Sequence, residues 1–441
     1  MTYDFIENGG GAGSGFIYKN TTAAYIFNGT TFAQITSAGY PAVTVRGVVY
    51  LDTTYYVMDP NGVIWGSNLA DPTIWSSLNS IQSQMEPDGG VALVRQLNLI
   101  VAFSQYSTEF FYDASNPTGS PLLPYQSAAL EIGCATADSV ASTENTIFFM
   151  GVARQKGRSI YRLDGTTPTP VSNPFIDRLL NADNLSDCQA WCIKIAGHGF
   201  YILTLRATGI TLVYDITTSL WGKWTTLTLA STKSITAASW VNNQVTLTVA
   251  AHGYADGDAT VIASSNPSGY NGTHVVNVVD ANTLTYDTTT NPGTYVGSAT
   301  IANYVESYFN MCSYTKAGNF DLVQDSTTGA VYAIDTGTYN DNGIPIKYRI
   351  RTSKFDGGDN KNKYFPKLEL IGDKVAAIGF VRYSNDDYQT WSAYRPVDLS
   401  LNRSLLSRLG RGRRRAFDMI NYDSQPIRME ALELTVEEGI T

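Results

Sequence analysis

At 441 residues the chain is longer than one hydrophobic core ordinarily spans, so it is either divided into domains or built from repeats. Only 16% of its residues are charged and its formal net charge is −9, which argues against a surface that wraps duplex DNA through many Lys and Arg contacts to phosphates. Aromatic residues make up 12% of the chain, including 28 tyrosines, which favours strands and interfaces and indicates a structural or assembly protein.

The N-terminal residues are not expected to form a signal peptide or a membrane span. Residues 1–14 carry Asp4 and Glu7 and no apolar core, and no later apolar run approaches the roughly 18 residues of a membrane span. We therefore expect a chain that is made in the cytoplasm of the cell that produces it and has no membrane anchor. The Gly-rich run at 8–15 has no P-loop pattern and is predicted to be a flexible arm or an assembly tail.

A β-hairpin pattern recurs along the chain. In residues 209–224 an alternating apolar run reaches Tyr214, turns at Asp215 and restarts at Leu220. Similar turns are marked by Asn28, Asp59, Asp113, Asp164, Asp215 and Asp335, at steps of 31, 54, 51, 51 and 120 residues. A hairpin unit that repeats about every 50 residues is typical of a β-propeller, whose four-stranded blades bury their faces by stacking on their neighbours.

An ordered set of short motifs between Val43 and Trp224 carries a family resemblance. The set consists of residues 65–75 (WGSNLADPTIW), 106–111 (YSTEFF), 131–135 (EIGCA), 160–165 (IYRLDG), 197–201 (GHGFY) and 211–215 (TLVYD). It resembles the packaged-DNA stabilisation proteins, or tail hub (nozzle) proteins, of short-tailed bacteriophages, with a weaker match after Ile301. The resemblance implies a homohexameric ring in the virion tail, docked below the portal and adaptor. Such a ring lengthens the tail tube and retains double-stranded DNA until ejection, and we expect its channel to be acidic.

Two side chains in these motifs are candidate catalytic residues. Glu109 follows two hydroxyl residues, as a catalytic acid would, but we expect an ordinary glutamate on an exposed edge strand. His198 lies between two glycines and titrates near neutrality, but no nucleophile pattern accompanies it, so a polar turn is the favoured interpretation. Metal-binding motifs are also missing from the sequence. We therefore predict no enzyme activity, no catalytic or metal-ligating residues and no cofactor.

Residues 232–304 account for the long last step between turn markers. This segment contains short strands about every 8 to 12 residues with Gly or Asn turns, which describes a small β-sandwich. It resembles the immunoglobulin-like modules that are inserted into phage surface proteins. Its role is left open between a contact to a tail fibre, spike or host glycan and an inert spacer.

A turn near the C-terminal end is similar to the Asp-box turn of sialidase-type propellers, S-x-D-x-G-x-x-W. Ser384, Asp386 and Trp391 occupy its signature positions, and Tyr388 replaces the usual glycine. In that family the motif braces a hairpin and is not the active site. Sialidase chemistry would also require an arginine cluster and a tyrosine nucleophile with an acidic partner, which the sequence does not identify. We expect a structural turn.

One dense basic segment interrupts this acidic chain at 401–415. Three interpretations of its six arginines are open: they bind phosphates, they pair with carboxylates of a neighbouring subunit or of the tail adaptor, or they lie on a solvated loop. We favour the contacts with protein. They are Arg403, Arg408, Arg411, Arg413, Arg414 and Arg415.

The residues near the C-terminal end predict a half-buried strand, because Leu432, Leu434 and Val436 alternate with polar residues. We expect this strand to close the ring by pairing with the N-terminal strands.

The sequence thus predicts an all-β chain, a β-propeller of about six blades. Its first part is expected at 1–231, the inserted immunoglobulin-like module at 232–304, and the second part at 305–441. The favoured function is the tail nozzle or hub. A glycan-binding or receptor-binding tail protein is the main alternative, and a propeller glycosidase is a weaker one.

Overall fold

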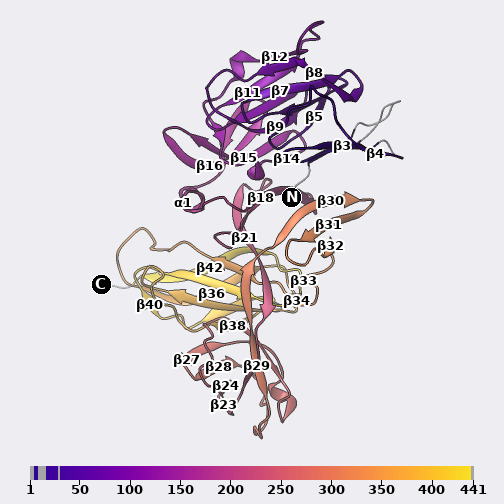
Figure 1. The fold of residues 1–441 in the computed structure, drawn as a ribbon. Coiled ribbons are helices and arrows are strands. Elements are labelled where there is room, and N and C mark those ends of the chain that lie inside the picture. Colours follow the sequence, from indigo (N-terminus) through magenta and orange to yellow (C-terminus); the bar gives the residue numbers. More distant parts are fainter. Residues whose placement is uncertain (1–3, 8–15, 28–29, 439–441) are drawn as a thin grey trace. The chain divides into compact units, whose positions relative to one another are not determined.

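The computed structural model describes residues 4–7, 16–27 and 30–438, and strands dominate it (Figure 1). The predicted arm at 8–15 and the turn at Asn28 lie outside the described residues. The chain divides into two compact units. The first is Met1–Trp224 with Tyr308–Ile334, and the second is Thr225–Ser307 with Asp335–Thr441. The predicted domain boundaries stay predictions.

In the first unit the described strands form five antiparallel sheets of successive segments and, fifth in chain order, part of an eight-stranded sheet. The first contains β1 (Asp4–Glu7), β2 (Phe16–Lys19), β3 (Ala24–Phe27) and β4 (Phe32–Gln34), and the second β5 (Val49–Leu51), β6 (Thr54–Met58), β7 (Val63–Asn68) and β8 (Asp71–Gln82). The third contains β9 (Gly90–Gln96), β10 (Leu99–Ser104), β11 (Thr108–Asp113) and β12 (Leu122–Pro124), and the fourth β13 (Gly133–Cys134), β14 (Ala141–Thr143), β15 (Thr146–Ala153), β16 (Lys156–Asp164) and β17 (Thr167–Pro170). The fifth contains β18 (Cys188–Ile195), β19 (His198–Leu205), β20 (Ile210–Asp215) and β21 (Leu220–Leu229), and the sixth β30 (Met311–Ala317), β31 (Phe320–Asp325) and β32 (Val331–Ile334).

Consecutive sheets of this unit stack face to face. In β15, neighbouring side chains point to opposite faces because the side-chain period of a strand is two. Phe149 packs against Phe103 of the third sheet, with ring centroids 4.7 Å apart. Phe148 stacks on Tyr201 of the fifth sheet at 5.1 Å. A sheet that buries both faces against its two neighbours is packed as a propeller blade is.

The hairpin turns are held by aspartate side chains. Asp215 Oδ1 accepts hydrogen bonds from the backbone amides of Thr217 and Thr218, at 2.8 and 3.2 Å. Asp325 repeats this arrangement between β31 and β32 with the same Asp-x-Thr-Thr sequence. The sequence predicts the last hairpin turn at Asp335, but the turn between β31 and β32 is at Asp325. Asp335 lies after β32 and accepts a hydrogen bond from the amide of Gly337. The side-chain oxygen mimics a backbone acceptor, which is why Asp recurs at these turns.

One α-helix interrupts the strands of the first unit. Helix α1 (Pro174–Ala182) begins after Asn173, whose side chain accepts hydrogen bonds from the amides of Phe175 and Ile176. Its Ile176 and Leu180 join the core between the fourth and fifth sheets. Short 3₁₀ turns occur at η1 (Gln126–Ala128) and η2 (Ala137–Ser139) in this unit, and at η3 (Ser268–Tyr270) in the other.

The second unit contains the inserted segment, whose two groups of strands enclose one core. The core includes Val245 and Leu247 from one group and Ile262 and Ile301 from the other. The first group is β23 (Ala237–Val241), β24 (Gln244–Thr248), β28 (Thr283–Asp287) and β27 (Asn277–Asp280), in spatial order. The second contains β22 (Lys233–Ser234), β29 (Thr300–Tyr308), β25 (Ala259–Ala263) and β26 (Gly272–Val275). The packing is that of a small sandwich, and its immunoglobulin-like character stays a prediction.

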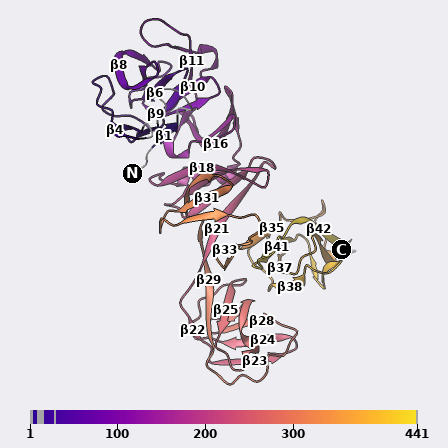
Figure 2. The same ribbon diagram turned by 90° about the vertical axis from the view of Figure 1, so that its right-hand side faces the viewer.

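The C-terminal residues of this unit form a second pair of sheets around a core that includes Phe365, Val381 and Met419. Figure 2 shows one sheet, β35 (Tyr348–Arg351), β41 (Ala416–Asn421), β37 (Ile378–Ser384) and β38 (Arg395–Asp398). The other contains β39 (Ser404–Ser407), β36 (Lys363–Gly372), β40 (Arg411–Gly412) and β42 (Met429–Glu438), and a hairpin of β33 (Asn340–Asp341) and β34 (Ile344–Pro345) precedes both.

The strand β42 differs from the expectation for the C-terminal end. It was predicted to pair with the N-terminal strands, but it pairs antiparallel with β36, with Leu432 opposite Leu370 and Leu434 opposite Leu368. Its apolar side chains pack on the C-terminal core instead. Alternation identifies a half-buried strand but does not identify its partner, which explains the error.

Candidate functional site

The most concentrated charge cluster of the described residues surrounds Asp418, in the middle of β41. Asp418 is completely buried. In the register of the sheet it lies directly opposite Arg351 of β35 on one side and Arg382 of β37 on the other. Residues at such cross-strand positions face each other on the same side of the sheet. The sheet therefore brings together three side chains that are far apart in sequence.

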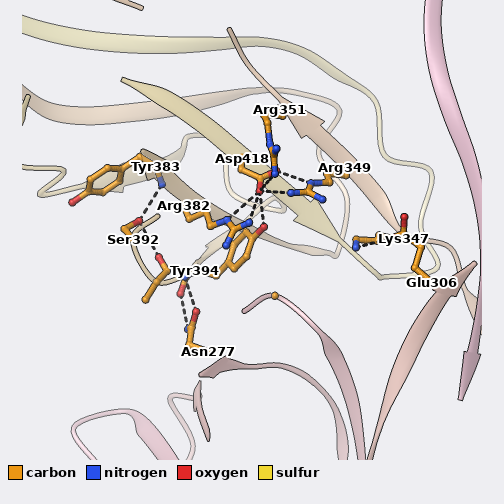
Figure 3. A network of polar contacts seen from close by, with 12 residues as sticks. Asn277, Glu306, Lys347, Arg349, Arg351, Arg382, Tyr383, Ser392, Tyr394 and Asp418 are labelled. Atoms are coloured by element: carbon orange, nitrogen blue, oxygen red, sulfur yellow. Dashed lines mark hydrogen bonds and ion pairs between the residues drawn. The ribbon is translucent and has the colours of Figure 1, made fainter. Parts of the chain in front are cut away.

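Three guanidinium groups and one hydroxyl converge on this carboxylate (Figure 3). Arg349 donates from Nε to Oδ1 at 2.8 Å and from Nη2 to Oδ2 at 2.7 Å, a two-pronged arrangement. Arg382 donates from Nε and Nη2 to Oδ2, both at 3.0 Å. Arg351 Nη2 is 3.3 Å from Oδ2, and the hydroxyl of Tyr394 donates to it at 2.9 Å.

These contacts keep Asp418 ionised. Burial by itself would raise the pKa of this carboxyl group. The hydrogen bond and charge of Arg349, with hydrogen bonds from Tyr394 and Arg382, outweigh that effect and lower the pKa to about 2. One negative charge is thus surrounded by three positive ones.

The excess positive charge reaches the surface. The side chains of Arg349 and Arg351 are 37% and 42% exposed, whereas Arg382 is nearly covered. Close by, Lys347 is paired with Glu306 at 2.6 Å. Two partly exposed guanidinium groups can donate further hydrogen bonds, so the cluster is suited to contact an anionic group on another molecule.

The Asp-box-like segment supplies one wall of this cluster. Trp391 lies under the guanidinium groups of Arg351 and Arg382, at 4.9 and 4.7 Å from its ring centroid. Asp386 Oδ1 accepts hydrogen bonds from the hydroxyl of Ser384 and the amide of Thr390. Its other oxygen, Oδ2, accepts one from the hydroxyl of Thr390. These bonds, of which the side-chain bond from Thr390 has the largest effect, lower the pKa of Asp386 to about 2. These hydrogen bonds within the turn stabilise it and position Trp391.

The six arginines of the basic segment have three different environments. Arg403 is paired with Glu369 at 2.5 Å, and Arg414 with Asp387 at 3.2 Å. Arg408, Arg411 and Arg413 are exposed, and their side chains make no hydrogen bond or ion pair within the described part of the chain.

Arg415 is buried within its own chain. Its guanidinium carbon lies 4.1 Å from the ring centroids of both Phe365 and Tyr383. Its nitrogens donate to Asn385 Oδ1 at 2.9 Å and to the carbonyl of Leu409 at 2.7 Å. Burial lowers its pKa to about 10. The expectation of an intermolecular contact therefore narrows to the exposed members of the segment.

The two candidate catalytic residues, His198 and Glu109, lie in ordinary polar arrangements. His198 Nδ1 is 3.0 Å from Asp215 Oδ2, and Asp215 also holds the hairpin turn described above. Glu109 is not the exposed edge residue that the sequence suggested, since it is only 8% exposed. It accepts hydrogen bonds from Ser83 Oγ and the amide of Met85. Among the described residues there is no group of three side chains placed to hold a metal ion.

Sequence reasoning missed the Asp418 cluster. One signal was present: Arg349 and Arg351 alternate with apolar residues in a predicted strand, which places both on one face. Their shared carboxylate is not visible from the sequence, because Arg351 and Asp418 are 67 residues apart.

The stacked antiparallel sheets define an all-β protein of the β-propeller class. The family model described as "Bacteriophage P22 Gp10, beta-propeller" matches residues 11–258. The chain belongs to this family of phage DNA-stabilisation proteins. The predicted family and the predicted β-propeller are thereby confirmed.

No curated protein matches the chain. A crystal structure of the computationally designed Ika8 protein is similar with a TM-score of 0.34 and 14% identity, over 72% of this chain and 80% of that one. No helix among the described residues is long and apolar enough to cross a membrane.

Proposed function

We propose that this chain forms a hexameric ring in the tail of a short-tailed phage, below the portal and adaptor, and that the ring extends the tail tube and retains packaged DNA until ejection. The family match over residues 11–258 carries the proposal, because it covers the second to fifth of the stacked sheets that would build the ring wall. The net charge of −9 supports a channel that does not hold DNA tightly.

The ring needs contacts between copies or to the adaptor, and exposed arginines can provide them. Arg408, Arg411 and Arg413 have no partner within the described chain and are free to pair with carboxylates of another molecule. The partly exposed Arg349 and Arg351 are a second candidate contact of the same sign. The proposed role of both groups is structural, and no catalysis is proposed.

Location in the particle is the primary test. Quantitative mass spectrometry of purified virions, with immunogold labelling of this chain, should give one ring per particle at the distal tail tube. Absence from particles, or label spread along fibres, would overturn the ring and favour the glycan-binding alternative. A glycan array with the intact chain would then test that alternative.

Assembly tests the arginine contacts separately. A variant with Arg408→Gln, Arg411→Gln and Arg413→Gln should assemble more weakly in sedimentation, with a smaller dependence on salt than the wild type. The matched control is Arg178→Gln, Lys223→Gln and Lys374→Gln, which removes the same charge from exposed side chains that also make no hydrogen bond or ion pair within the described residues. Equal assembly of both variants would exclude the basic segment as a contact.

A further inference from the structure

A cavity of about 440 Å³ lies in the first unit, between the second and third sheets. Its walls include Ile81, Met85, Phe110 and Pro124, and glutamines 82, 84 and 126 lie at exposed positions around it. The volume falls within the range of pockets that hold small ligands or single side chains. Its lining combines apolar walls with a small number of polar groups.

The one charged residue that lines this cavity is Glu109, on β11. Its side chain is more than nine-tenths buried, and it takes part in no ion pair with a described residue. Both of its hydrogen bonds from the protein reach the same oxygen, Oε1: one from Ser83 Oγ and one from the Met85 amide at 2.9 Å. The other oxygen, Oε2, accepts no hydrogen bond from the described residues.

A buried carboxylate with one unused oxygen is a strong acceptor for a cation. Oε2 is not among the buried atoms that lack a partner, so solvent and a cation can reach it. A carboxylate that the protein shields on its other sides attracts a cation more strongly than a fully exposed one. Among natural cations, a guanidinium is held best by two carboxylate oxygens, whereas an ammonium is a compact charge that one oxygen can hold. A guanidinium can also donate to a single oxygen, as Arg382 does at Asp418, but it then loses the two-oxygen arrangement that holds it best. Since Oε1 of Glu109 is already occupied, the geometry favours an ammonium group.

We propose that this cavity binds a primary alkylammonium, with the methylene chain along Ile81, Met85, Phe110 and Pro124 and the ammonium at Glu109 Oε2. Two sources share this chemistry: a lysine side chain of a partner protein and a free alkylamine. The site does not depend on the proposed ring. It differs from a sugar site in requiring the charge of Glu109.

The test uses the full chain labelled with ¹³C at its methionine methyl groups, because Met85 lines the cavity and reports on it by NMR. The probes are N-acetyl-lysine methylamide, its arginine and norleucine equivalents, and 1-pentylamine. We expect saturable shifts of the Met85 signal with the lysine amide and pentylamine, and binding at least about tenfold weaker for arginine and norleucine. If only pentylamine binds, the natural ligand is a free amine rather than a side chain. If the norleucine amide binds the wild-type chain as tightly as the lysine amide does, the ammonium group is not recognised and the proposal is overturned.

Glu109→Gln removes the charge and keeps an acceptor for Ser83 and Met85. It should weaken the binding of lysine amide by roughly tenfold or more, while Glu144→Gln, the same change at an exposed position, should leave it unchanged. Unchanged binding in the folded Glu109→Gln variant would rule out the ammonium site. Tighter binding of neutral sugars than of amines, equal in both variants, would assign the cavity to glycans instead.

Discussion

Asn277 and Tyr394, which are 117 residues apart, exchange two hydrogen bonds. Asn277 Nδ2 donates to the carbonyl of Tyr394 at 3.1 Å, and Asn277 Oδ1 accepts from the amide of Tyr394 at 2.7 Å. The hydroxyl of the same tyrosine donates to Asp418. One asparagine of the inserted segment is thus joined through one tyrosine to the carboxylate that organises the C-terminal sheet (Figure 3).

Replacing this asparagine should loosen the inserted segment. Asn277→Ala leaves two buried backbone groups of Tyr394 without partners, so we expect a loss of about 2–4 kcal/mol in the free energy of unfolding. Urea unfolding of the full chain measures the loss. Gln244→Ala is the control, since this exposed amide bonds only to the exposed Asp287 and should cost less than about 0.5 kcal/mol. Similar effects of the two variants would show that the pair at Tyr394 does not fasten the segment.

Asp418→Asn should be among the most destabilising single changes in the second unit. The substitution leaves three guanidinium groups facing one another with no carboxylate between them. Breaking a buried ion pair by removing one partner costs about 3–5 kcal/mol. Asp373→Asn breaks the exposed pair with Arg428 and should cost less than about 1 kcal/mol in the same denaturation experiment. A loss below about 1 kcal/mol for Asp418→Asn would mean that the arginines rearrange freely into solvent.

The difference between wild type and Asp418→Asn should depend on pH. The folded pKa of Asp418 is about 2, against 3.8 for an unperturbed group, so the unfolded chain binds the proton more readily. Its ionised form therefore contributes stability above about pH 4, and this contribution of about 2 kcal/mol is lost as the pH falls toward 2. Urea unfolding of both proteins between pH 7 and pH 2 measures it. A difference that stays constant over this range would contradict the ion-pair account.

The repeated part of the fold was predictable because its information is local. Alternation in the strands and Asp-based turns such as Asp215 mark each hairpin within a few residues of sequence. The two faces of β15 can likewise be assigned from adjacent residues, because Phe148 and Phe149 point to opposite sides of the strand and join different cores. Stacking of successive sheets then follows from the need to bury both faces.

The sites depended on pairing between distant segments, which local patterns do not encode. Arg351 and Arg382 meet at Asp418 only because β35 and β37 flank β41 in a particular register. The same limit produced the error at β42, whose pairing with β36 is decided by the C-terminal core. It also hid the burial of Glu109, because the donors to its carboxylate, Ser83 and Met85, lie 26 and 24 residues away in sequence.

Arg415 should prove to be a structural residue, unlike the other arginines of its segment. Arg415→Lys keeps the charge but loses the flat contacts with Phe365 and Tyr383 and the fixed spacing of its donors. We expect a loss of about 2 kcal/mol in the free energy of unfolding, with the buried carbonyl of Leu409 left short of a donor. Arg413→Lys, at an exposed position two residues away, should change stability by less than about 0.5 kcal/mol. Equal stability of the two variants would indicate that a lysine can replace every contact of Arg415, and would return this residue to the set of candidate intermolecular contacts.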